Sequence, residues 1–139
     1  MKVFYKIRMM AVLVALLGGT LASIEVSADE FTKRDLQGWT SEYLSVVKEG
    51  RQLFTSPTLG TNGVACAQCH PNAANTHPET YPKFQKQLGK VITIADMVNW
   101  CIANPLEGKR LAADGRKMTA LITYITDERR GVALDPGKH

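Results

Sequence analysis

The chain has 139 residues, of which 45% are hydrophobic and 22% are charged, and its formal net charge is +4 at pH 7. This length predicts one small domain once any export signal has been removed. Because no concentrated basic stretch is present, the charge argues against a nucleic-acid-binding protein, and we expect no nucleic-acid partner.

The first 28 residues have the layout of an export signal. A positively charged start leads into an apolar run from Met9 to Leu17, and Val26-Ser27-Ala28 fits the small-residue rule for cleavage before Asp29. An uncleaved membrane anchor is the alternative, although the apolar run is short for a spanning helix. We therefore predict a signal peptide over residues 1–28 and a periplasmic or otherwise exported protein. The protein would be membrane-anchored if this segment were retained.

Residues 29–38 are polar and charged, and we expect them to form a loosely held lead-in. The apolar residues between Trp39 and Phe54 recur at helical spacing, with Thr40 or Ser41 available as the N-cap. Pro57 ends this pattern. The sequence therefore predicts a first helix from about Trp39.

Two further helices are predicted after residues 71–90, a proline-containing stretch that we expect to wrap irregularly around another group. The second helix begins at Thr93, with Asp96 in the position of a capping box, and ends at Asn104-Pro105. The third spans about residues 114–130, with Gly131 placed to end it. No strand pattern stands out, so the predicted fold class is all-α.

The motif with chemical content is Cys66-Ala67-Gln68-Cys69-His70, the c-type haem attachment signature. Two thiols one helical turn apart can each form a thioether with a vinyl group on one porphyrin edge. The next residue, His70, can then present its imidazole to the iron as the proximal ligand. We predict one covalently attached haem c, held through Cys66 and Cys69.

Three other interpretations compete for these cysteines. A plain disulfide suits an exported protein but leaves His70 unexplained. A thioredoxin-like redox pair requires a βαβ surrounding that the sequence does not predict. A structural zinc site requires four ligands, and the three cysteines and three histidines show no second paired motif.

With this motif, the chain resembles the class I cytochrome c family over most of residues 40–130. Gly50-Arg51-Gln52-Leu53-Phe54 resembles the end of that family's N-terminal helix, and Leu121-Ile122-Thr123-Tyr124-Ile125 resembles its C-terminal helix. The resemblance implies a small cytochrome c fold in which these helices cross, with Gly50 and Tyr124 at the contact. It further implies a haem wrapped by loops and a distal helix. We assign residues 39–131 to this cytochrome c domain and 132–139 to a tail.

The second axial ligand is less obvious, because the Met-Pro pair common in that family is absent. The candidates after the motif are His77, Met97, Cys101 and Met118. His77 follows His70 after a short path, and we expect it on the surface, whereas we expect Met118 in the core. Met97 and Cys101 are four residues apart and share one helical face, where a core role is the alternative to ligation.

A narrower resemblance separates these two residues. Met97-Val98-Asn99-Trp100-Cys101, Gly108-Lys109 and residues 118–125 together resemble the haem domains of thiosulfate dehydrogenases and of sulfur-oxidising Sox cytochromes. In that group a cysteine at the position of Cys101 coordinates the iron opposite histidine. The resemblance therefore places Cys101 ahead of Met97 as the distal ligand.

Three functions are consistent with the sequence. The first is electron transfer, by a soluble carrier or by a subunit of a redox complex, with other redox proteins, a membrane redox complex or a second cytochrome subunit as partners. A basic rim could steer acidic partners, although an ordinary solvated surface explains the same residues: Lys83, Lys86, Lys90, Lys109, Arg110, Arg116 and Lys117. The second is an enzyme oxidising small sulfur anions such as thiosulfate, weakened by the single attachment motif and by the lack of an arginine beside Cys101. The third is a gas-binding or sensor haem protein.

Overall fold

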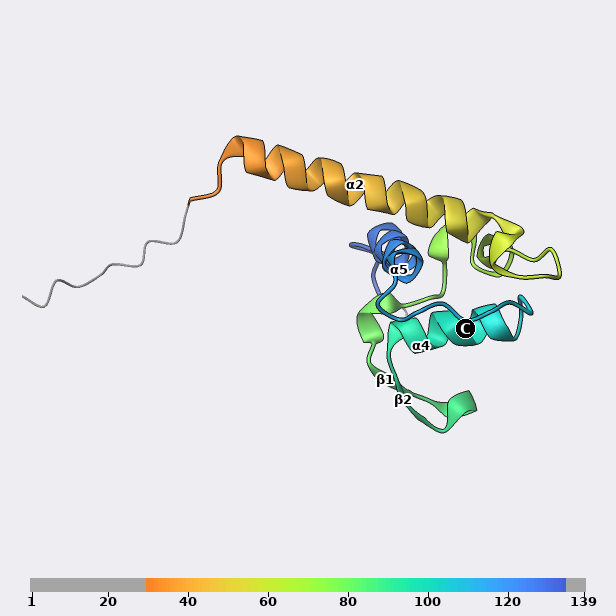
Figure 1. Ribbon diagram of the computed structural model, residues 1–139. Coiled ribbons are helices and arrows are strands. Elements are labelled where there is room, and N and C mark those ends of the chain that lie inside the picture. Colours follow the sequence, from red (N-terminus) through yellow and green to blue (C-terminus); the bar gives the residue numbers. More distant parts are fainter. Residues whose placement is uncertain (1–29, 135–139) are drawn as a thin grey trace, which may run out of the picture. The chain divides into compact units, whose positions relative to one another are not determined.

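The structure, a computed structural model, describes residues 30–134 (Figure 1). The predicted signal peptide over 1–28, and residues 135–139 of the predicted tail, lie outside the described residues. All the described helices and strands belong to the structural unit that begins at Thr32.

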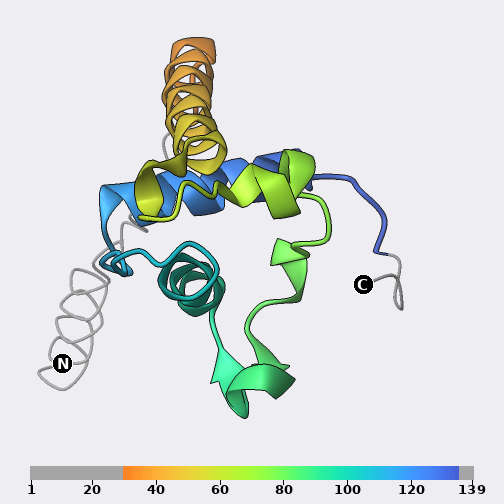
Figure 2. The same ribbon diagram turned by 90° about the vertical axis from the view of Figure 1, so that its right-hand side faces the viewer.

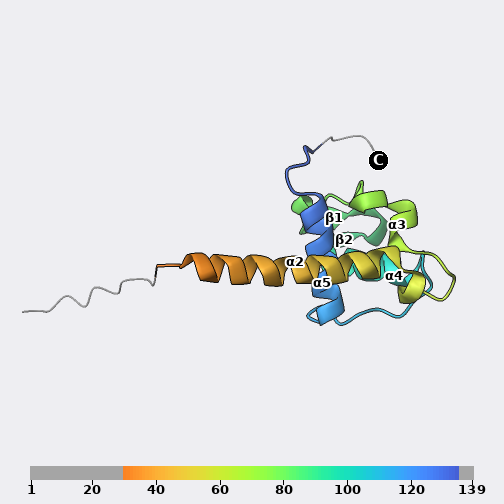
Figure 3. The same ribbon diagram turned by 90° about the horizontal axis from the view of Figure 1, so that it is seen from above.

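The first described helix, α2, spans Lys33–Thr55 and begins earlier than predicted. Thr32 and Asp35 form a capping box in which the Thr32 hydroxyl accepts from the Asp35 amide and the Asp35 carboxylate accepts from the Thr32 amide. Residues 33–38 of the predicted lead-in are therefore helical, and the predicted cap at Thr40 or Ser41 is wrong. Apolar spacing detects only the part of a helix that packs, and the first half of α2 extends beyond the other elements (Figures 1 and 3).

The last described helix, α5, spans Arg116–Glu128 and crosses the second half of α2 (Figures 2 and 3). Gly50 lies at the crossing, where a Cβ atom would stand only 2.0 Å from the Ala120 carbonyl oxygen and 2.7 Å from the Tyr124 Cβ. The Phe54 and Tyr124 rings pack with their centroids 5.1 Å apart. The predicted crossing of the two helices, with Gly50 and Tyr124 at the contact, is confirmed.

The third long helix, α4, spans Ile94–Ala103, and its N-terminus has the predicted capping box of Thr93 and Asp96. Asn99 holds this helix to the chain that leads into α5. Its amide nitrogen donates to the Leu111 carbonyl at 2.9 Å, and its oxygen accepts from the Leu111 amide at 2.8 Å. Both peptide groups are thereby satisfied in a half-buried position.

The segments between the long helices consist of single turns. They include the short helix α3 at Cys66–Cys69 and four 3₁₀ turns: η1 at Pro57–Leu59, η2 at Pro71–Ala73, η3 at Pro78–Thr80 and η4 at Lys86–Leu88. The predicted irregular course over 71–90 is confirmed apart from one hairpin, and its wrapping around another group stays a prediction. In the hairpin, β1 at Lys83–Gln85 pairs antiparallel with β2 at Lys90–Ile92. Strands of three residues are too short for their alternation to be read from the sequence.

Apart from the two three-residue strands, the regular structure is helical, and the predicted all-α class is confirmed. The core lies between α2, α4 and α5 and includes the side chains of Phe54, Ile102, Leu106, Leu121 and Tyr124. Within residues 30–134, no helix is both long and apolar enough to span a membrane.

Candidate cofactor-binding site

A cavity of about 650 Å³ opens between α4, α5, the cysteine motif and the segment that leads into the hairpin. In Figure 2, α4 is seen end-on at one side, the chain from η3 to β1 lies at the other, and α5 runs across. This volume falls within the range of about 300–1,000 Å³ typical of cofactor sites. Most of the lining is apolar, and it includes Phe54, Phe84, Ile94, Val98, Leu121 and Ile125.

The cysteine motif forms one wall. Cys66 and His70 both line the cavity, whereas Cys69 lies at the other end of α3 and is exposed. The His70 Nδ1 lies 2.8 Å from the Ala74 carbonyl oxygen. Since a carbonyl can only accept, Nδ1 carries the proton and Nε2 keeps its lone pair. His70 is therefore oriented and in the right tautomer to ligate a metal through Nε2.

Helix α4 forms the wall that contains both expected distal ligands. Met97 and Cys101 each line the cavity and are half-buried. Burial raises the pKa of the Cys101 thiol to about 11, and the nearby Cys66 and Cys69 contribute in the same direction. Cys101 is therefore a neutral thiol at neutral pH until a metal binds it.

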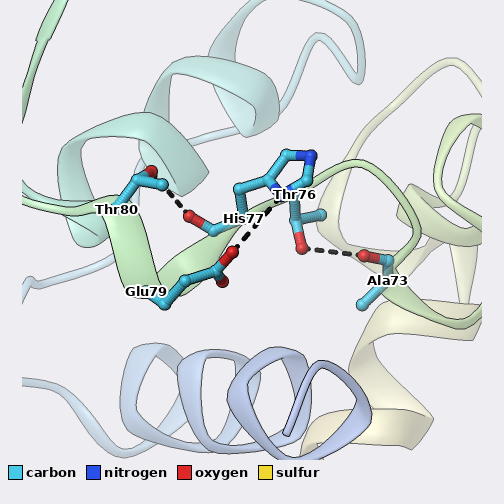
Figure 4. Close-up of polar contacts among 5 residues, drawn as sticks. All are labelled: Ala73, Thr76, His77, Glu79 and Thr80. Atoms are coloured by element: carbon cyan, nitrogen blue, oxygen red, sulfur yellow. Dashed lines mark hydrogen bonds and ion pairs between the residues drawn. The ribbon is translucent and has the colours of Figure 1, made fainter. Parts of the chain in front are cut away.

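His77 does not lie on the surface, so that prediction is wrong. Its side chain lines the cavity, the residue is only 9% exposed, and its Nδ1 lies 3.3 Å from a Glu79 carboxylate oxygen (Figure 4). The Thr76 hydroxyl donates to the Ala73 carbonyl, and the Thr80 hydroxyl donates to the His77 carbonyl. Consecutive turns with these bonds, and a left-handed backbone at His77 (φ 47°), fold the residue inward. The sequence contains no local signal for this arrangement.

Met118 is fully buried, and its predicted place in the core is confirmed. The residues of the predicted basic rim do not lie together: Lys83 and Lys86 line the cavity, whereas Arg116 pairs with Glu49 of α2 at 2.8 Å.

Tyr81, which the sequence did not indicate, also lines the cavity, and its ring lies under the Lys83 ammonium. The sequence signal that could have indicated Tyr81 is its position as an aromatic residue directly before a proline.

The arrangement fits a haem better than the alternatives. The three cysteines are free thiols, and residues 30–134 contain no cluster of three or more His, Cys, Asp or Glu side chains that could bind a metal alone. Hence neither a disulfide nor a zinc site is observed in the described part of the chain. Cys66, an available His70 Nε2 and a soft donor on α4 instead surround one apolar cavity, as a porphyrin iron requires.

A sequence model of the SoxA/TsdA cytochrome c domain matches residues 49–134. The chain belongs to this family. The expected resemblance to the haem domains of thiosulfate dehydrogenases and Sox cytochromes is therefore confirmed, and with it a cytochrome c domain that binds haem c.

Individual relatives agree with this membership. The chain is 28% identical to the L-cysteine S-thiosulfotransferase subunit SoxA of Rhodovulum sulfidophilum, covering 76% of this chain and 38% of the relative. It is 26% identical to a thiosulfate dehydrogenase of Psychrobacter arcticus, covering 61% of this chain and 30% of the relative. This cytochrome c domain thus spans less than half the length of the curated relatives it matches.

The crystal structure of SoxXA from P. pantotrophus is similar in fold. The TM-score is 0.61 at 23% sequence identity, and the match covers 73% of this chain and 40% of that one. The predicted small cytochrome c fold is confirmed by this likeness together with the family match.

Proposed function

We propose that this protein is an exported monohaem c-type cytochrome that transfers electrons as a carrier or as a subunit of a redox complex. The observation that carries the proposal is the convergence of Cys66, His70 and the α4 pair Met97 and Cys101 on one apolar cavity. The family match to a cytochrome c domain supports it. Haem bound there would supply one-electron redox chemistry.

The residues of the chain have separate roles in this proposal. Cys66 and Cys69 provide the thioether sulfurs, so the cofactor cannot dissociate. The bond between His70 and the Ala74 carbonyl fixes the imidazole of the proximal ligand and increases its basicity. The apolar side chains of α4 and α5 that line the cavity would shield a bound haem from water.

We propose Cys101 as the distal ligand, with Met97 as the alternative. A Cys101 thiolate would donate charge to the iron and favour its ferric state, whereas a Met97 thioether would raise the potential. Cys101 lines the same cavity as Cys66 and His70, and the family resemblance supports it ahead of Met97.

Acidic organic extraction tests the covalent attachment, and spectra of the purified protein and two variants test the distal ligand. Haem that stays with the polypeptide after acidic organic extraction would establish covalent attachment, and loss of the haem would refute it. With Cys101 as ligand, the low-spin ferric optical and EPR spectra change in Cys101→Ser and persist in Met97→Ala. The opposite pattern would transfer the role to Met97.

Export and assembly belong to the same proposal. Residues 1–28 would direct the chain to the periplasm or another exported location, with membrane anchoring if they are retained. A second cytochrome subunit is the proposed partner, since a solved relative in fold is named SoxXA and a curated relative is named as a subunit. The mass of the mature chain, and its co-purification with a second haem protein from native membranes and periplasm, would test these points.

Oxidation of small sulfur anions is the second candidate function. It is favoured by relatives named thiosulfate dehydrogenase and by Cys101 in the cavity wall. Thiosulfate turnover by the isolated haem-loaded chain, with an artificial electron acceptor, would favour the enzyme. Reduction only in the presence of a partner protein would favour the carrier.

A further inference from the structure

The loop that precedes the cysteine motif is bonded to the loop that follows α4. The Thr61 amide donates to the Leu106 carbonyl at 3.0 Å, and the Thr61 hydroxyl donates to the Glu107 carbonyl at 2.9 Å. More than forty positions of the chain separate the partners of the second bond. We call this contact between residues 59–62 and 105–108 the loop clamp.

Two glycines allow the backbones of the clamp to touch. A Cβ on Gly60 would stand 2.1 Å from the Leu106 carbonyl oxygen, and a Cβ on Gly108 would stand 2.0 Å from the Leu59 carbonyl oxygen. A backbone oxygen cannot turn aside as the end of a side chain can. Each loop therefore needs a residue without a side chain where it meets the other.

The clamp continues directly into the last turn of α4. The Leu106 amide donates to the Cys101 carbonyl at 3.2 Å, and the Gly108 amide donates to the Ile102 carbonyl at 2.7 Å. Carbonyls in the last turn have no partner within their own helix, so a helix end frays unless other groups bond to them. Leu106 donates to Cys101 through its amide and accepts from Thr61 through its carbonyl. The clamp thus holds the end of α4 that contains Cys101.

Asn62 connects the clamp to the cysteine motif. Its amide nitrogen donates to the Pro105 carbonyl at 2.8 Å, and its oxygen accepts from the Val64 amide at 3.1 Å. Val64 lies two residues before Cys66. One side chain therefore bonds both to the segment that leaves α4 and to the segment that enters the motif.

We propose that the loop clamp positions Cys101 for ligation of the haem iron. Cys66 would fix one edge of the haem, and the clamp would prevent the last turn of α4 from moving away from that edge. A ligating side chain has to be held within about 0.5 Å of its productive position by the residues that support it. Gly60, Gly108 and Asn62 are thus positioning residues. The inference rests on the proposed function in that it takes Cys101 as the distal ligand.

Imidazole titration of the ferric, haem-loaded protein tests the clamp, because imidazole can occupy the sixth position only when the sulfur has left it. In Asn62→Asp the carboxylate still accepts from the Val64 amide but cannot donate to the Pro105 carbonyl. The apparent imidazole affinity should rise about twofold to tenfold, the effect of losing one neutral hydrogen bond. Asn62→Ala, which adds no charge, should act in the same direction. Gly108→Ala should raise the affinity further, because it forces the two backbones apart.

Thr58→Val is the matched control for these variants. The Thr58 hydroxyl accepts from the Ser56 hydroxyl within the same loop, so its loss leaves the bonds between the two loops in place. Thr58→Val should bind imidazole like wild type. In a Cys101→Ser background, Asn62→Asp should cause no further rise, because the ligand that the clamp positions is already missing.

A merely structural role would lower the urea midpoint of the clamp variants and leave imidazole binding in the absence of urea unchanged. That result in both Asn62 variants would overturn the proposal, even if Gly108→Ala fails to fold. A full rise with Asn62→Asp in the Cys101→Ser background would also overturn it, since the clamp would then act on something other than Cys101. Absence of covalent haem from wild type would instead refute the proposed function, so the two failures are distinguishable.

Discussion

At the scale of single residues, Gly50 decides how closely the two terminal helices approach. A methyl group in its place would meet the Ala120 carbonyl at 2.0 Å, and backbone cannot move aside as a side chain can. Overpacking of this kind costs about 1–3 kcal/mol. We expect Gly50→Ala to lower the free energy of unfolding by at least that amount, measured by urea denaturation of the haem-loaded protein.

Gly38 offers a matched control within the same helix. Nothing lies within 4 Å of a Cβ at this position, and alanine is the better helix former by about 0.5–1 kcal/mol. Gly38→Ala should therefore leave stability unchanged or raise it slightly. Equal destabilisation by the two substitutions would mean that close packing is not the reason for Gly50.

Asn99 is the second residue with a role that its type alone does not indicate. It satisfies both the amide and the carbonyl of Leu111 and so ties the ligand-bearing helix to the chain before α5. Asn99→Ala leaves both groups without this partner, and an unsatisfied group of this kind lowers the free energy of unfolding by about 1–3 kcal/mol. We expect a lower urea midpoint and an altered haem midpoint potential, because α4 would be held less firmly.

Asn104 provides the comparison, since its amide donates to the Trp100 carbonyl from an exposed position. Asn104→Ala should change stability by much less and leave the potential unaffected. A wild-type potential in Asn99→Ala would show that the tie is dispensable for the placement of α4.

At the scale of elements, the capping box of α4 predicts a pH dependence. Hydrogen bonds from the Thr93 amide and hydroxyl lower the pKa of Asp96 below its model-compound value of 3.8. A carboxyl whose folded pKa is lowered contributes stability that is fully present above its unfolded pKa and is lost as the pH falls through the folded pKa. Asp96→Asn should therefore lose stability at pH 7 and show a smaller further loss on acidification below about pH 4.

Asp35 tests whether the effect depends on packing. It forms the same box with Thr32, and its pKa is lowered for the same reason, but it caps the end of α2 that extends beyond the other elements. Asp35→Asn should reduce helix content by circular dichroism with little change in global unfolding. Comparable losses of global stability from the two variants would contradict this distinction.

At the scale of the whole molecule, the cavity links folding to the cofactor. An apolar space of about 650 Å³ lies between α4, α5 and the motif, so a chain without haem would leave these walls unsupported. A Cys66→Ser and Cys69→Ser double variant should lose covalent haem and unfold at a much lower temperature. Cys101→Ser, which keeps the attachment residues, should retain the haem and most of the thermal stability. An unchanged melting temperature in the double variant would show that the protein part is stable alone.

Local chemistry is what the sequence determined by itself. The spacing of Cys66, Cys69 and His70, the capping box at Thr93 and the helical spacing before Gly131 act over a few residues, so they can be read directly from the chain. The crossing at Gly50 and Tyr124 was foreseen through family resemblance, because a contact between distant segments leaves no local pattern.

The tertiary structure decided everything that depends on distant segments meeting. Thr32 extends α2 through polar residues that no apolar spacing reveals, and His77 turns inward because a series of turns folds around it. Lys83 and Tyr81 lie in the same cavity as Cys101 only because the hairpin folds back toward α4. A sequence specifies which side chains are available, but burial and the closeness of charges arise when the packed helices bring those side chains together.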